Sequence, residues 1–170
     1  GVTLTGIRQQ ATHITAELKK GDERFELKAP LLVAADGATS PCREMLGVNA
    51  TTTPYGQVAL VTTVATHLPH KSIAFERFTE SGPLALLPLP DDRRSIVWTL
   101  PAGTEQALID CSDEEFLAQL QAAFGKRAGR FVKTAKRFAY PLALTVAQTQ
   151  AQPRAVILGN AAHTLHPVAG

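Results

Sequence analysis

The fold is decided by a stretch near the end of the chain that reads Arg154-Ala155-Val156-Ile157-Leu158-Gly159-Asn160-Ala161-Ala162-His163-Thr164-Leu165-His166-Pro167-Val168-Ala169-Gly170. Residues 155–158 form a continuous apolar run, which is typical of a strand buried on both faces of a parallel sheet. Open α/β sheets build ligand crevices where such strands end in glycine and small residues. We expect a helix to begin near Gly170, so this stretch predicts one half of a binding site.

A second stretch of the same design lies upstream and reads Pro30-Leu31-Leu32-Val33-Ala34-Ala35-Asp36-Gly37-Ala38-Thr39-Ser40-Pro41-Cys42-Arg43. A buried strand over residues 31–35 delivers Asp36 and Gly37 at its carboxyl end. Ser40 and Pro41 open a short helix, because Ser is a favoured N-cap and Pro suits the first helical position. The two strand-to-loop junctions predict that both strands belong to one sheet and that the residues between them form an insertion.

The composition is that of a globular protein of one domain or slightly more. The chain has 170 residues, of which 45% are hydrophobic and 19% charged, as in ordinary soluble domains. A net charge of +2 with scattered Lys and Arg does not favour nucleic-acid binding. No apolar run approaches the roughly 20 residues of a membrane-spanning helix. Cys42 and Cys111 have no CxxC spacing, which disfavours a disulfide framework or a zinc site, so we expect a cytoplasmic setting.

The order of elements predicts three segments. Residues 1–50 read as an antiparallel meander that leads into the first junction strand. Residues 51–150 read as a separate antiparallel sheet followed by a helix over 113–124, which begins at a capping box from Ser112 to Glu115. Residues 151–170 return to the first domain. The predicted strands of the middle segment cover residues 57–65, 72–78, 84–89 and 95–100, the last with Ile96, Trp98 and Leu100 on one face.

Both ends of the chain lie inside predicted elements. The chain begins without a methionine, within what reads as a strand, and ends at Gly170 within a loop. We therefore interpret it as an internal fragment of a longer protein.

The two junctions resemble known motifs. Residues 35–43 resemble the Asp-Gly motif of the class A flavoprotein aromatic hydroxylases, and residues 159–163 through His166-Pro167 resemble their Gly-Asp motif. Residues 82–89, with Val97-Trp98, resemble the middle segment of the ubiquinone-biosynthesis branch of that family. The resemblance covers nearly all of the chain.

The resemblance implies an α+β and α/β architecture, in which a Rossmann-like FAD/NAD(P)-binding domain is interrupted by an antiparallel-sheet substrate domain. It implies FAD as cofactor, NAD(P)H as co-substrate, and insertion of one atom of O₂ into a polyprenylated phenol through a flavin hydroperoxide. The residues carried over as cofactor-binding are Asp36, Gly37, Ser40, Arg43, Gly159, Asn160, His166, Pro167 and Gly170.

Two features separate this chain from the full family pattern. Asn160 stands where the family usually has an Asp that contacts the FAD ribitol, and an amide keeps hydrogen-bonding capacity but no charge. The Gly-x-Gly-x-x-Gly turn that binds the FAD pyrophosphate precedes residue 1 in such proteins. We therefore expect the fragment by itself to be inactive.

Other interpretations of these residues stay open. Asp36 can also serve only as a turn-forming residue before glycine. The parent protein can be a flavoprotein that acts on another aromatic or prenyl substrate, or a non-catalytic scaffold subunit of a quinone-biosynthesis complex with a decayed cofactor site at Asn160. His163 and His166 have no evident third ligand, so no metal site is predicted, and no catalytic side chain is assigned.

A polyprenyl substrate implies a membrane contact that is peripheral at most, at the inner membrane, and other ubiquinone-biosynthesis proteins are possible partners. A basic run contains Lys126, Arg127, Arg130, Lys133, Lys136 and Arg137. A solvated face is the ordinary interpretation of such a run, and a contact with anionic lipid is the alternative.

Overall fold

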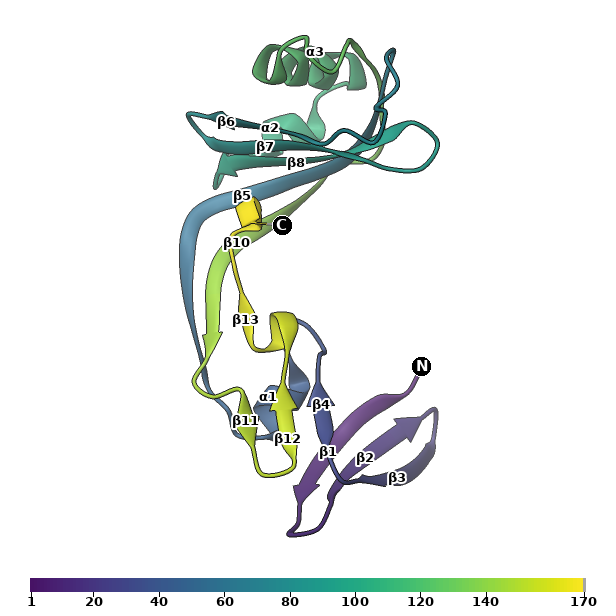
Figure 1. Ribbon diagram of the computed structural model, residues 1–170, viewed down its shortest axis with the longest axis vertical. Helices are drawn as coiled ribbons and strands as arrows, with labels where there is room; N and C mark the ends of the chain where they lie inside the picture. The colour runs from purple at the N-terminus through teal and green to yellow at the C-terminus, as the bar shows by residue number, and fades with distance from the viewer. Residues whose placement is uncertain (170) are drawn as a thin grey trace. The chain divides into compact units, whose positions relative to one another are not determined.

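The computed structural model describes residues 1–169, and the chain divides into two compact units (Figure 1). The first unit contains Gly1–Thr53 and the chain from Ala143 onward, and the second contains Pro54–Leu142. The second unit is therefore inserted into the first, as the two junctions predict. Strands β5 (Ala50–Thr66) and β10 (Phe138–Ala147) carry the chain between the units.

The boundaries of the units differ from the predicted segments at two places. The predicted boundary near residue 51 falls inside β5, because the polar residues 51–53 continue that strand. Residues 143–150, predicted to belong to the middle segment, group with the first unit. Ala147 explains this grouping, since it packs in the core of that unit with Ile14 and Leu46.

The first unit opens with an antiparallel three-stranded sheet, as predicted. Its strands β1 (Thr3–Gln9), β2 (Ile14–Lys20) and β3 (Glu23–Ala29) pair in sequence order. Gly21 makes the turn between β2 and β3 with a φ of +60°, a conformation that glycine adopts at little cost. Ile14 is buried and contributes to the core beneath the two junctions.

Both junction strands belong to one small sheet, which confirms the central prediction. Strand β4 (Leu32–Ala34) pairs in parallel with β12 (Ala155–Ile157), and β11 (Ala151–Gln152) pairs antiparallel with β12 on its other side. The remaining short elements of this unit are α1 (Pro41–Met45), the 3₁₀ helix η1 (Gly159–Ala161), β13 (His163–Thr164) and the 3₁₀ helix η2 (Pro167–Ala169).

The prediction that these strands are buried on both faces is wrong for β4. Ala34 is fully buried, whereas Val33 is 51% exposed. Burial alternates because side chains of a strand point to opposite faces, and the described core covers only one face of β4. The strand also lies at an edge of its sheet.

The second unit is built on an antiparallel sheet with helices on one face. Strands β6 (Phe75–Thr79), β7 (Gly82–Pro88) and β8 (Arg93–Pro101) are sequential antiparallel neighbours, as predicted, and β5 continues the sheet between β8 and β9 (Phe131–Thr134).

Helix α3 (Asp113–Phe124) lies over that sheet (Figure 1). The predicted face of β8 packs against it: Ile96, Trp98 and Leu100 are buried in one cluster with Phe116 and Leu120. Trp98 is therefore a core residue.

The limits of α3 follow from local sequence signals. Ser112 Oγ accepts a hydrogen bond from the Glu115 backbone N–H at 3.1 Å, which is the predicted N-cap. Gly125 ends the helix with a φ of +86°.

Helix α2 (Glu105–Asp110) was not predicted from the sequence. It has six residues, a single buried side chain at Leu108 and no side-chain cap, so it offers too little periodicity to be detected. Within residues 1–169, no helix is both long enough and apolar enough to cross a bilayer.

Candidate functional site

The two predicted junctions lie side by side in the first unit. Because β4 and β12 are parallel, their carboxyl ends reach the same edge of the sheet, and the Leu158 N–H donates a hydrogen bond to Ala34 O at 2.8 Å beyond the last paired residues. Gly37 and Gly159 follow with φ values of +91° and +55°. The left-handed backbone conformation at both glycines lets the chain turn away from the strand that precedes each of them.

Asp36 is turned toward the start of α1. Its Oδ1 accepts a hydrogen bond from Ser40 Oγ, and its Oδ2 accepts one from the Cys42 N–H at 2.9 Å. Partial burial favours the neutral acid, but these hydrogen bonds outweigh it and lower the pKa of Asp36 below its ordinary value. The carboxylate therefore orders its own loop, as the turn-forming interpretation expects, while the residue stays exposed at the edge of the sheet.

Ser40 and Cys42 complete this loop. Ser40 is fully buried, and its Oγ accepts a hydrogen bond from the Arg43 N–H at 3.0 Å while it donates to Asp36. Ser40 is the N-cap of α1, as predicted. Burial, and then the neighbouring Asp36 carboxylate, raise the pKa of the Cys42 thiol to about 11, so this thiol is neutral at physiological pH.

Arg43 joins the two junctions directly. Its side chain is buried, and its guanidinium donates to Ala161 O at 2.7 Å and to Ala38 O at 3.1 Å. One acceptor belongs to η1 and the other to the Asp36 loop. The sequence predicted only that Arg43 shapes its own turn; no local pattern reveals a contact between residues 118 positions apart.

Asn160 lies at the open side of the second junction. It is exposed, and none of the hydrogen bonds among residues 1–169 involves its side-chain amide. A Cβ atom built on Gly37 or Gly159 would meet no atom within 4 Å, so the space beside both turns is open. An unengaged amide next to open backbone fits a polyhydroxylated group such as the ribityl chain of FAD.

The other predicted site residues lie farther along the same loop. His166 Nδ1 accepts a hydrogen bond from the Val168 N–H at 3.3 Å, and Pro167 begins η2. Gly170 lies outside the described residues. In the part of the chain that the structure describes, no group of three or more His, Cys, Asp or Glu side chains is arranged to hold a metal ion.

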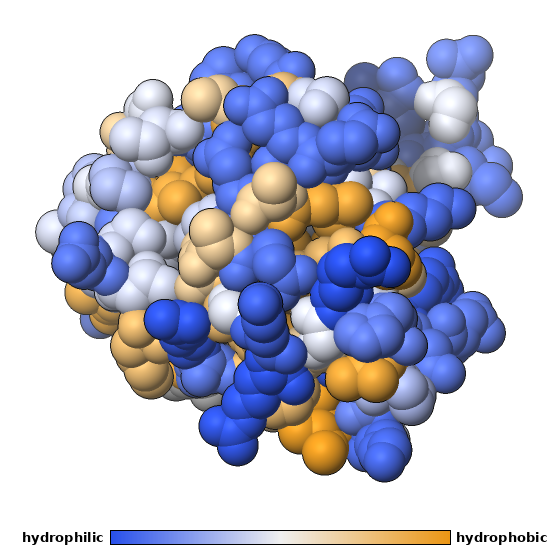
Figure 2. Space-filling view, turned by 90° about the horizontal axis from the view of Figure 1, so that it is seen from above, coloured by the Kyte–Doolittle hydropathy of each residue, from blue (hydrophilic) through white to orange (hydrophobic). Residues whose placement is uncertain are grey.

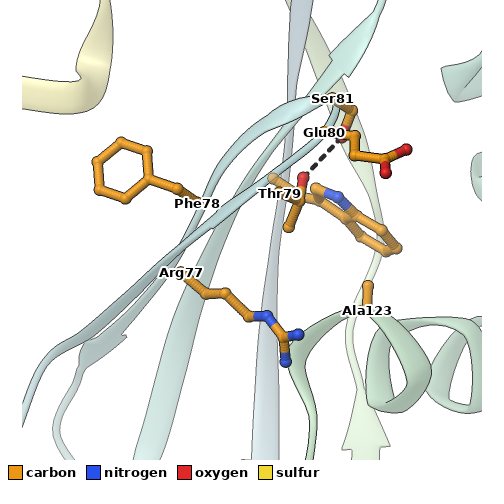
Figure 3. Close-up of a pocket in the computed structure, with 7 residues that line it drawn as sticks. Arg77, Phe78, Thr79, Glu80, Ser81 and Ala123 are labelled. Atoms are coloured by element: carbon orange, nitrogen blue, oxygen red, sulfur yellow. Dashed lines mark hydrogen bonds between the residues drawn. The ribbon is translucent and has the colours of Figure 1, made fainter.

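A recess of about 550 Å³ lies in the second unit, between the β6–β7 hairpin and α3 (Figure 3). Arg77 points toward α3, where its Nη1 donates to Phe124 O at 2.8 Å, and Phe78 points away from it. Thr79 and Ser81 hydrogen-bond to each other across the hairpin at 3.0 Å. None of the predicted cofactor-binding residues lines this recess.

The fold of this chain, a parallel strand pair interrupted by an antiparallel sheet, is also found in solved structures of aromatic hydroxylases. The fold matches aklavinone-11 hydroxylase, solved as a ternary complex with FAD and aklavinone, with a TM-score of 0.69 and 19% identity; the match covers 96% of this chain and 32% of that one. The FAD binding domain family matches residues 1–170, and the chain belongs to this family.

Two curated relatives share more of the sequence. The ubiquinone hydroxylase UbiL of Rhodospirillum rubrum is 37% identical over 167 residues, which are 98% of this chain and 38% of the relative. The 3-demethoxyubiquinol 3-hydroxylase of Escherichia coli is 32% identical over 154 residues, which are 91% of this chain and 38% of the relative. The chain thus spans somewhat over a third of the length of these relatives.

Proposed function

We propose that the full-length protein is an FAD-dependent monooxygenase that hydroxylates a polyprenylated phenol in ubiquinone biosynthesis, with NAD(P)H and O₂ as co-substrates. The observation that carries the proposal is the pair of junctions tied together by Arg43 in a chain of the FAD binding domain family. The names of the bacterial relatives support the substrate class. The motifs also resemble those of 2-octaprenyl-6-methoxyphenol hydroxylase. What we propose is the class of substrate, a polyprenylated phenol, and not the ring position that is hydroxylated.

The residues of the junctions have separate roles in this proposal. Asn160 and the backbone at Gly159 bind the ribityl chain, while Asp36, with Gly37 and Ser40, holds the adjacent loop in shape. Arg43 keeps the two loops in register. The backbone around His166 and Pro167 shapes the side of the site that faces the flavin ring. When bound, FAD supplies the redox chemistry and the activation of O₂, so the chain itself needs to orient and to shield rather than to provide a nucleophile.

The second unit offers a surface for an apolar substrate. On the sheet face opposite α3, Val61 pairs with Val97, and Val97 pairs with Ala85 on the next strand. All three side chains are partly exposed. Small apolar residues on adjacent strands make a flat wall, and we assign to it the aromatic ring and the first part of the prenyl chain.

The test uses the full-length protein. Purified protein should carry a yellow flavin spectrum or acquire it on addition of FAD, and NAD(P)H oxidation should rise when a short-chain prenylphenol is added. Protein that stays colourless after incubation with FAD would remove the proposal. Analysis of quinone precursors after deletion of the gene distinguishes this substrate class from another aromatic or prenyl substrate.

A scaffold subunit without catalysis is the second candidate, and the specific observation in its favour is Asn160 in place of the usual Asp. This substitution removes a charge but retains both a donor and an acceptor. Substrate-stimulated oxidation of NAD(P)H by the reconstituted protein would exclude the scaffold. Tight FAD binding without any turnover on prenylphenols would favour it.

A further inference from the structure

We propose that one end of the second unit docks on an anionic lipid surface through three loops, residues 67–74, 89–93 and 125–130, which together we call the loop surface. This inference rests on the proposed function, because a polyprenylated phenol dissolves in a bilayer and an enzyme that acts on it needs a surface that contacts the membrane. It adds the surface that makes the contact.

Hydrogen bonds hold the three loops together. The His67 N–H donates to Arg130 O at 3.0 Å, and the Arg130 N–H donates to His67 Nδ1 at 2.8 Å. His70 Nε2 lies 2.9 Å from Leu89 O, and His70 Nδ1 accepts from the Ser72 N–H at 2.9 Å, so the Nε2–H donates to the carbonyl. The loops therefore present one connected surface.

Gly129 lets the first and third loops approach closely. A Cβ atom at this position would meet the His67 ring at 2.9 Å and the Leu68 side chain at 3.0 Å, and its φ is +86°. Glycine has no Cβ and adopts this φ readily. Leu68 is thereby supported from beneath while its other side stays in solvent.

The loop surface exposes apolar side chains. Leu68 is 47% exposed and Ile73 is 50% exposed, and Pro69 next to Leu68 is exposed as well. A single exposed aliphatic side chain is ordinary on a protein surface. Two within one loop, together with the exposed Lys71 of the same loop, give the mixture of apolar and basic groups that binds at the headgroup boundary of a membrane.

The charge of the loop surface complements an anionic membrane. It contains five cationic residues, against two acidic ones at Asp91 and Asp92. Its excess of positive charge is thus larger than the +2 of the whole chain. The five cationic residues are Lys71, Arg93, Lys126, Arg127 and Arg130.

A cavity beside the loop surface is lined by two cationic side chains. Ala65 on β5 lies opposite Arg93 on one neighbouring strand and opposite Lys133 on the other. The two cations thus stand on one face with only a methyl group between them, and both line a cavity of about 420 Å³. An ammonium recognises an anionic headgroup as a point charge and a guanidinium recognises it through paired hydrogen bonds. Arg93 also forms an ion pair with Asp91 at 3.2 Å, with which a headgroup would compete.

The predicted basic run divides in the structure. Arg137 does not belong to the loop surface, because its guanidinium donates to Cys111 O at 2.9 Å, forms an ion pair with Asp113 at 3.2 Å and is only 11% exposed. Arg137 therefore stabilises the N-terminal end of α3. Figure 2, a space-filling view from above, shows hydrophobic residues set among hydrophilic ones.

The experiment is flotation of the full-length protein with vesicles of phosphatidylcholine alone or with phosphatidylglycerol added. Wild-type protein should float with the anionic vesicles and less with the neutral ones. Lys71→Gln/Lys126→Gln should lower binding by about 20-fold, because each cation near the membrane contributes about fivefold. Ile73→Gln should weaken binding in high salt as well as in low salt, because it removes apolar contact.

A matched control variant, Lys20→Gln/Lys28→Gln, removes two exposed cations from the first unit and should float like wild type. Wild-type protein that does not float, or an equal loss in the control and loop variants, overturns the proposal. Circular dichroism of each variant shows that it is folded. Flotation requires no turnover, so a protein that floats but neither binds FAD nor hydroxylates a prenylphenol would contradict the proposed function alone.

Discussion

Arg43 is a buried cation whose guanidinium donates hydrogen bonds to backbone carbonyls. Burial of a charge is costly unless hydrogen bonds replace its hydration, and the carbonyls of Ala38 and Ala161 supply two of them. Backbone acceptors are fixed by the fold, so the guanidinium holds the two loops at a set distance. A planar group with several donors suits this task better than an ammonium.

We expect Arg43→Ala to destabilise the first unit by about 3 kcal/mol, because it leaves the buried carbonyl of Ala161 and the partly buried carbonyl of Ala38 without a donor. Arg43→Lys should retain the charge but reach only one carbonyl, and should recover part of the loss. Urea unfolding followed by fluorescence and FAD titration of the full-length protein measure both effects. Arg24→Ala, at an exposed position, is the control; equal midpoints for Arg43→Ala and Arg24→Ala would contradict the assignment.

The Cys42 thiol should be slow to react with alkylating agents. Its pKa is raised from 9.0 to about 11, so at pH 8 the thiolate is about a hundredfold rarer than for an unshifted thiol. The alkylation rate should then rise about tenfold per pH unit until the pH approaches 11. Mass spectrometry of the Cys42 peptide after iodoacetamide pulses gives this profile. A plateau reached below pH 9 would show that the Asp36 carboxylate and burial do not act on the thiol.

The charge missing at position 160 should matter only modestly. A hydrogen bond to a charged group contributes about 1.5–3 kcal/mol and a neutral one about 0.5–1.5 kcal/mol, so Asn160→Asp should change FAD affinity by about tenfold in either direction. Asp36→Ala should weaken FAD binding more clearly, because it releases Ser40 and the start of α1. Titration of both full-length variants with FAD shows which of the two positions matters more for FAD affinity. A thousandfold change in affinity for Asn160→Asp, with no change for Asp36→Ala, would reverse the expected order.

Local sequence signals determine where helix α3 begins and ends. Ser112 caps its first turn and Asp113, Glu114 and Glu115 follow, which places negative charge at the positive end of the helix dipole. The helix then buries Phe116 and two further apolar residues against the sheet.

Ser112→Ala should lower the free energy of unfolding by about 1 kcal/mol, the usual contribution of an N-cap. Ser112→Thr should restore most of it, because the hydroxyl is retained. Thermal or urea unfolding compares the three proteins. If Ser112→Thr is as unstable as Ser112→Ala, then packing rather than the hydrogen bond to Glu115 explains the effect.

The two units have separate hydrophobic cores. One cluster gathers Leu60, Leu84, Ile96 and Leu120, and the other gathers Ile14, Ala34 and Ile157 with their neighbours. Separate cores permit one unit to open while the other stays folded.

Leu120→Ala should therefore loosen the second unit selectively. Leu120 is fully buried, and such a truncation costs about 2–5 kcal/mol. Hydrogen exchange measured by mass spectrometry should speed up in α3 and in β6 to β8, and stay unchanged in β4 and β12. Faster exchange throughout the chain would mean that the two units unfold as one.

Much of this architecture can be predicted from sequence patterns. The caps of α1 and α3, the antiparallel strands β6 to β8 and the pairing of the two junction strands depend on turn chemistry, periodicity and apolar runs. The family resemblance adds the cofactor class, which no periodicity contains. The caps and the hairpins are predictable because residues close together in the chain decide them, whereas the pairing of the junction strands followed from the common design of the two stretches.

Only the tertiary structure decided which groups meet across the chain. It showed that Arg43 reaches Ala161 and that Val33, on one face of β4, is left uncovered. It also separated Arg137 from the cations of the loop surface. Each of these depends on a partner far away in sequence or on what covers a surface, and hydrogen bonding and burial at such positions are set by packing rather than by the residue's own neighbours.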